Sequence, residues 1–82
     1  MTLQEVAAEL AQRTNCEVQP GDNPYEVMVK GNGYHFVVAP FFGGWQATLF
    51  VPGEKPVLFF AEVVEMLEAR LKAKLSGRDH NF

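Results

Sequence analysis

The first stretch of the chain shows the apolar spacing of an amphipathic helix. Four apolar residues recur at the i, i+3, i+4 and i+7 spacing of one helical face: Leu3, Val6, Ala7 and Leu10. Thr2 and Glu5 have the spacing of a capping box, in which each side chain accepts a hydrogen bond from the other residue's backbone N–H. Asn15 is a suitable stop residue. The pattern predicts a helix from just after Thr2 to near Asn15.

After the helix, apolar and polar residues alternate along the chain, as in strands. A short strand is expected at 16–19, and the Pro-Gly-Asp-Asn-Pro sequence at 20–24 predicts a turn. The segments 25–30 and 34–39 then alternate apolar and polar positions around Gly31-Asn32-Gly33. A two-residue loop would put Val27 and Val29 on the same face as Phe36 and Val38, whereas a three-residue loop would divide the apolar set between faces. The parity and the Asn-Gly sequence predict a hairpin with a primed turn.

A third long strand is predicted at 45–51, after the break at 40–44. Pairing Pro40 with Trp45 extends the apolar face by setting Val38 beside Ala47 and Phe36 beside Leu49. After the turn formers at 52–56, an apolar stripe at helical spacing predicts a last helix over 59–75, with Gly77 as its stop: Phe60, Val64, Leu67, Leu71 and Leu75.

These elements predict an α+β fold in α-β-β-β-β-α order, in which the short segment 16–19 makes the difference between three strands and four. The sheet is expected to be an antiparallel meander of three to four strands, with both helices packed on one face, because each apolar stripe and the apolar sheet face need cover. We expect one domain over 1–77 and a flexible C-terminal tail over 78–82.

Composition restricts the partners more than it identifies them. The chain has 82 residues and a formal net charge of −3. Its basic residues gather near the end of the chain and form no stripe, so nucleic acid is disfavoured as a partner. No apolar run approaches a membrane span, and no signal-peptide pattern opens the chain, so a cytoplasmic location without membrane contact is expected. The single cysteine, Cys16, fits a reducing compartment.

Little in the sequence points to catalysis, a metal or a cofactor. Cys16 and His35 are the only pair that suggests a nucleophile and its base, but Cys16 occupies an expected inward position, where a free cysteine usually packs as a small hydrophobe. Asp79 and His80 lie in the expected tail, without metal-ligand spacing to His35. Gly31-Asn32-Gly33 joins two strands, whereas a phosphate loop precedes a helix. We expect no metal and no cofactor.

Three features are candidates for binding a partner. Phe41 and Phe42, with Trp45 nearby, either cap the core or protrude as an aromatic anchor. The acidic run Glu62, Glu65 and Glu68 is either an ordinary solvated helix flank or a stripe that docks on a basic partner. The sheet face away from the helices is expected to show more apolar side chains than a solvated face needs, beside His35: Met28, Val37 and Phe50.

The order helix, three strands, helix is shared by double-stranded-RNA-binding domains. Contacts to RNA in that family need a basic cluster at the start of the last helix, and here Glu62 and Glu65 occupy that region. Only the element order is similar, and the family is not assigned.

The sequence therefore predicts a small acidic protein-binding module without catalytic activity. It would act through the outer sheet face or the aromatic loop 40–45, and one version of this prediction is a homodimer. An alternative follows from the profile of a small, acidic, single-domain chain, which resembles that of phage or mobile-element inhibitors such as anti-CRISPR proteins. In that case the chain would block a basic, nucleic-acid-binding surface of a host complex. The third alternative is a thiol enzyme that uses Cys16 and His35.

Overall fold

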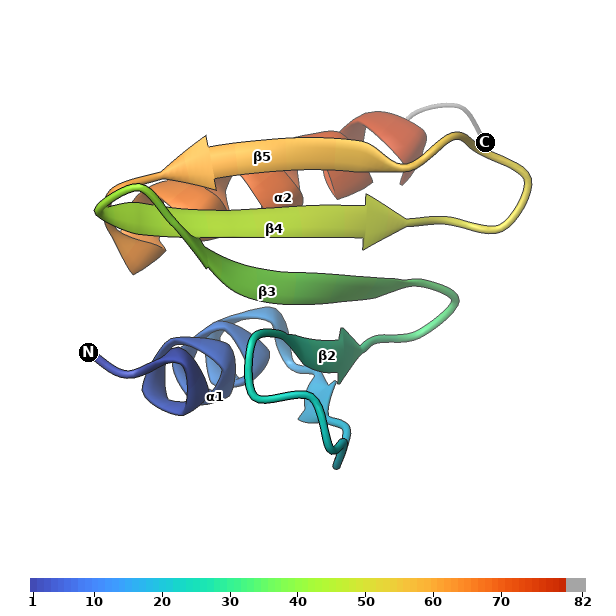
Figure 1. Ribbon diagram of the computed structural model, residues 1–82. Coiled ribbons are helices and arrows are strands. Elements are labelled where there is room, and N and C mark those ends of the chain that lie inside the picture. The colour runs from blue at the N-terminus through green and yellow to red at the C-terminus, as the bar shows by residue number, and fades with distance from the viewer. Residues whose placement is uncertain (80–82) are drawn as a thin grey trace.

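A computed structural model of the chain describes the backbone of residues 1–79 and the side chains of residues 1–76. In the sequence, one helix precedes the sheet and one follows it. The sheet is a meander: each strand pairs antiparallel with its neighbour in sequence, in the order β1-β2-β3-β4-β5 (Figure 1). In chain order the elements are α1 (Leu3–Thr14), β1 (Glu17–Val18), β2 (Val27–Lys30), β3 (His35–Phe41), β4 (Gly44–Phe50), β5 (Val57–Ala61) and α2 (Val64–Asp79). The predicted α+β meander is confirmed, with a fifth strand added.

Helix α1 begins and ends as its sequence predicts. The Thr2 hydroxyl accepts from the Glu5 N–H at 3.2 Å, and the Thr2 N–H donates to the Glu5 carboxylate at 2.8 Å. Asn15 closes the helix in the left-handed conformation, with φ 57° and ψ 46°. Short polar side chains tolerate this conformation best after glycine, which explains the stop.

The register of the sheet confirms the parity argument. Val27 lies opposite Val38, and Val29 lies opposite Phe36. In the next hairpin Phe36 lies opposite Leu49, which keeps the apolar face continuous. The expected primed turn at Asn32-Gly33 is wrong, however. Gly33 has φ +81° but Asn32 has no positive φ, and primed turns need a positive φ at the first central position.

The expected helix over 59–75 is wrong in its first turn. Val57–Ala61 forms the edge strand β5, which pairs with β4, and α2 starts only at Val64. Phe60 and Val64 have helical spacing, but they belong to two different elements. Strand β5 forms because the backbone N–H and C=O groups along one side of β4 would otherwise lack hydrogen-bond partners. Helix α2 also continues past Gly77 to Asp79. Residues 80–82 of the expected tail lie outside the described residues.

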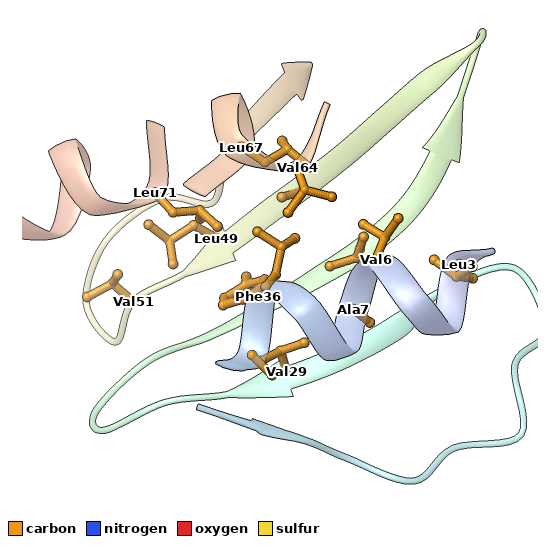
Figure 2. Close-up of a cluster of buried hydrophobic side chains, with 14 residues drawn as sticks. Leu3, Val6, Ala7, Val29, Phe36, Leu49, Val51, Val64, Leu67 and Leu71 are labelled. Carbon is orange, nitrogen blue, oxygen red and sulfur yellow. The ribbon is translucent and has the colours of Figure 1, made fainter. Parts of the chain in front are cut away.

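Both helices cover the same face of the sheet, where the core lies (Figure 2). Val6 and Ala7 of α1 and Leu67 and Leu71 of α2 point onto strand residues such as Phe36. Within residues 1–79, no helix lies on the opposite face of the sheet, which we call the outer face. Its large apolar side chains all come from strand positions whose neighbours in sequence face the core: Met28, Val37, Phe41, Phe50, Leu58 and Phe60.

Candidate interaction surface

The β3–β4 hairpin ends in an aromatic residue that stands in solvent. Phe41 pairs with Gly44, so the turn consists of Phe42 and Gly43 alone, with φ +40° and φ +79°. Positive φ at both central residues is the pattern of a type I′ turn, which strongly favours Asn or Gly at the first position. Phe42 nevertheless occupies it and is 95% exposed. Phe42 therefore strains the backbone, and its apolar side chain gains almost no free energy from burial.

Phe42 belongs to a small cluster that we call the aromatic tip: Phe41, Phe42 and Phe60. The rings of Phe41 and Phe42 are nearly perpendicular, with centroids 4.7 Å apart, and the centroid of Phe41 lies 4.6 Å from that of Phe60 on β5. Beside the cluster is an open hollow of about 500 Å³, which also reaches Trp45 and Met66. The aromatic tip thus combines a protruding ring with a neighbouring depression.

The backbones of β4 and β5 approach closely beneath the aromatic tip. A Cβ atom at Gly44 would lie 2.7 Å from the carbonyl oxygen of Ala61, which is closer than such atoms can approach. Glycine is therefore required where the hairpin leaves the turn, and it allows Phe60 to reach Phe41.

The outer face continues from the aromatic tip across the middle of the sheet. Met28 lies opposite Val37 on the neighbouring strand, and Leu58 of β5 lies opposite Thr48. Met28 is 42% exposed and Leu58 is 51% exposed. His35 stacks on Phe50 with ring centroids 4.8 Å apart, as the predicted pairing of these positions implies. A second open hollow of about 530 Å³ adjoins this end of the face.

Two parts of the predicted surface lie elsewhere. Trp45 pairs with Pro40 on the core side of the sheet, where it packs half-buried against the core. The acidic run does not form one helix flank, because Glu62 precedes α2 and lines the hollow at the aromatic tip. Glu65 and Glu68 instead face α1, where both contact Arg13.

Arg13 and Lys72 neutralise much of the predicted acidic stripe. The Arg13 guanidinium donates to the Glu68 carboxylate at 2.9 Å and lies 3.5 Å from Glu65, while Lys72 lies 2.7 Å from Glu68. The hydrogen bonds from Lys72 and Arg13 hold the pKa of Glu68 below its ordinary value. These glutamates therefore join α1 to α2 and are already engaged within the chain.

Cys16 and His35 lie on opposite faces of the sheet. The Cys16 sulfur lies 3.1 Å from the Tyr34 hydroxyl and 3.3 Å from the Thr14 carbonyl oxygen, on the core side. Burial and the contact with Cys16 raise the pKa of Tyr34 to about 12. His35 stacks on Phe50 on the outer face, so it is not within hydrogen-bond reach of the thiol as the dyad requires.

Among the side chains of residues 1–76, no group of three or more histidine, cysteine or acidic residues is placed to hold a metal ion. In the same part of the chain, neither helix has the length and apolar character needed to cross a membrane.

Sequence reasoning missed three residues of the surface. Leu58 lies between the predicted turn and the predicted helix and was assigned to neither, Phe60 was assigned to the helical stripe, and Met66 was not singled out. The available signal was the unbroken apolar run Val57–Ala61 after Pro56, which is typical of a strand and too short for a helix.

Comparison with protein-family models, with curated proteins and with solved structures gave no match to this chain.

Proposed function

We propose that this chain is a protein-binding module that acts through the aromatic tip and the adjoining outer face. The observation that carries the proposal is Phe42, which is 95% exposed in a left-handed conformation that other residue types adopt at lower cost. Strain of this kind tends to concentrate at functional positions. Exposed aromatic side chains are also the residues that most often anchor protein interfaces.

The chemistry of the surface fits an apolar pocket on a protein partner. The aromatic tip offers one exposed ring, Phe42, in contact with the ring of Phe41, and a hollow beside it. Among the described residues, Glu62 adds one carboxylate to the lining of this hollow. An anchor with a polar rim is the usual organisation of a protein–protein interface.

The test is capture of a partner from the native host with three versions of the chain. Wild-type protein and Tyr25→Asn should retain the same partner, because Tyr25 is an exposed aromatic residue, 76% exposed, in a loop outside the aromatic tip. Phe42→Asn should lose the partner while its circular dichroism spectrum stays unchanged. Equal capture by Phe42→Asn and the wild type would contradict the proposal.

Salt dependence separates this proposal from the inhibitor alternative. An aromatic anchor should bind with little change between low and high salt, whereas docking on a basic surface should weaken steeply. A steep loss of affinity with salt, together with insensitivity to Phe42→Asn, would favour the inhibitor.

A further inference from the structure

The sheet has two unequal edges. At one edge β1 is only two residues long, while at the other β5 runs over Val57–Ala61 (Figure 1). The sequence of β5 is Val-Leu-Phe-Phe-Ala, without a charge, a proline or a glycine. Natural edge strands usually carry such features, because an unprotected edge readily pairs with another strand. Within residues 1–79, no strand pairs with the outer edge of β5.

Burial shows that the core is incomplete at this edge. Ala47 and Leu49 on β4 are fully buried, but the residues that lie opposite them on β5, Phe59 and Val57, are only partly buried. On the outer face Leu58 and Phe60 are both exposed. Apolar surface on both sides of β5 would be buried by a strand added alongside it.

The flank of α2 that overhangs this edge is also apolar at its start. One flank of α2 faces α1: Glu65 and Glu68 on it form ion pairs with Arg13 of α1, and Lys72 pairs with Glu68. Because α1 packs on the β1 side of α2, the opposite flank lies above the β5 edge. The helical period places four residues on this opposite flank: Val63, Met66, Arg70 and Lys74. Val63, just before α2, and Met66, in its first turn, are exposed apolar side chains.

We propose that β5 pairs antiparallel with β5 of a second copy of this chain, around a two-fold axis normal to the sheet. The two meanders then form one continuous sheet with all four helices on one face. This inference goes beyond the proposed function, because it concerns the β5 edge and holds whether or not the aromatic tip binds a partner.

The register of the pairing follows from symmetry. Opposite residues in a strand pair share a face, so such a two-fold axis must set one residue opposite its own copy. Centring on Phe59 places Leu58 opposite the partner's Phe60 and Val57 opposite the partner's Ala61, which uses the whole strand. Centring on Phe60 would set Leu58 opposite the partner's Glu62, and centring on Leu58 would bring Lys55 and Pro56 into the apolar row.

Charge complementarity supports this register. Ten residues along α2, from Val64 to Lys74, rise about 15 Å, and the five residues of β5 span roughly 13–17 Å. Because α2 runs back along β5 (Figure 1), Lys74 comes level with the start of the strand. The Phe59-centred register places the partner's Glu62 there, opposite Pro56 and just outside the paired strands, where the alternation of strand faces does not hold its side chain on the outer face. The symmetry repeats this lysine–glutamate pair, which fixes orientation more than it adds affinity.

Sedimentation equilibrium tests the proposal on the full chain. We expect a dimer for the wild type and a dissociation constant raised about tenfold or more by Leu58→Lys, which sets a charge opposite the partner's Phe60. The matched control is Met28→Lys, at another exposed outer-face position on β2, which should leave the dimer unchanged. A wild-type monomer at millimolar concentration overturns the proposal, as does a dimer that only Met28→Lys disrupts.

A charge exchange tests the register itself. Lys74→Glu and Glu62→Lys should each weaken the dimer, and the double variant should restore it, since each pair is then reversed. If the double variant is weaker than both single variants, the proposed register is wrong. Phe42→Asn should leave the dimer intact, so failure of this proposal and failure of the proposed function are distinguishable.

Discussion

Phe42 shows how one residue can oppose the preferences of its own turn. Its φ of +40° is found mainly at Gly and Asn, yet its ring is in solvent, where it gains little from burial. The sequence raised the exposure of Phe41 or Phe42 as one of two alternatives. It could not decide between them, because burial of an aromatic loop depends on where the neighbouring strand lies, and β5 had not been recognised.

Replacement of Phe42 by asparagine should stabilise the fold. Relief of the left-handed conformation contributes about 1–2 kcal/mol, and loss of the ring contact with Phe41 offsets roughly 0.5–1.5 kcal/mol of it. Because the Phe42 ring is almost fully exposed, we expect the contact to lie at the low end, so the free energy of unfolding should rise by roughly 0.5–1 kcal/mol. Urea denaturation measures it. A fall in stability of similar size would show that the ring is packed.

Glu68 gives stability a defined pH dependence. Its pKa is lowered in the folded chain by Lys72 and Arg13, so its contribution is present above the unfolded-state pKa of about 4.3 and is lost as the pH falls through the folded-state value. Glu68→Gln should therefore be less stable than the wild type at pH 7, and the difference should shrink below about pH 4. Denaturation at both pH values measures this. The control, Glu26→Gln at an exposed position outside the helices, should show a smaller change.

At the scale of elements, the sequence predicted correctly the features that depend on residues close together in the chain. The capping box of α1 and the parity of the two hairpins needed only neighbouring residues, and both agree with the structure. The boundary between β5 and α2 depended on pairing with β4, which is distant in sequence terms from the helical stripe. The apolar spacing of Phe60 and Val64 suited either element, so tertiary pairing decided the outcome.

The stripe of α2 that the sequence did identify should carry much of the stability. Leu67 is fully buried, while the adjacent Met66 is exposed on the opposite flank. Leu67→Ala should lower the free energy of unfolding by about 2–5 kcal/mol, through lost burial and a residual cavity. Met66→Ala should change it by less than about 1 kcal/mol. Thermal or urea denaturation of both variants compares them, and similar effects would mean that α2 packs with a different face.

At the scale of the whole molecule, both helices lie on one side and leave the outer face uncovered. This layer arrangement was predictable from three apolar faces that must meet. The identity of the partner was not predictable, because the spacing of apolar residues shows which faces are buried and not what an exposed surface binds.

A charged pair in the centre of the outer face should separate binding from folding. Val37→Lys with Phe50→Glu changes two half-buried positions on that face without touching the core. We expect the double variant to keep its circular dichroism spectrum and lose its partner. Unfolding would show that the face is required for stability, and unimpaired capture would restrict the interface to the aromatic tip.

The position of Phe42 at the apex of the longest hairpin has a kinetic consequence. Strands β3 and β4 pair from His35 opposite Phe50 to Phe41 opposite Gly44, and a turn of only two residues joins them. Such local pairs form early, since little loop-closure entropy opposes them. The strain at Phe42 should then act on the folding rate, and Phe42→Asn should fold about two- to fivefold faster with little change in unfolding. Stopped-flow refolding and unfolding measure both rates, and an unchanged folding rate with slower unfolding would place closure of this hairpin after the transition state.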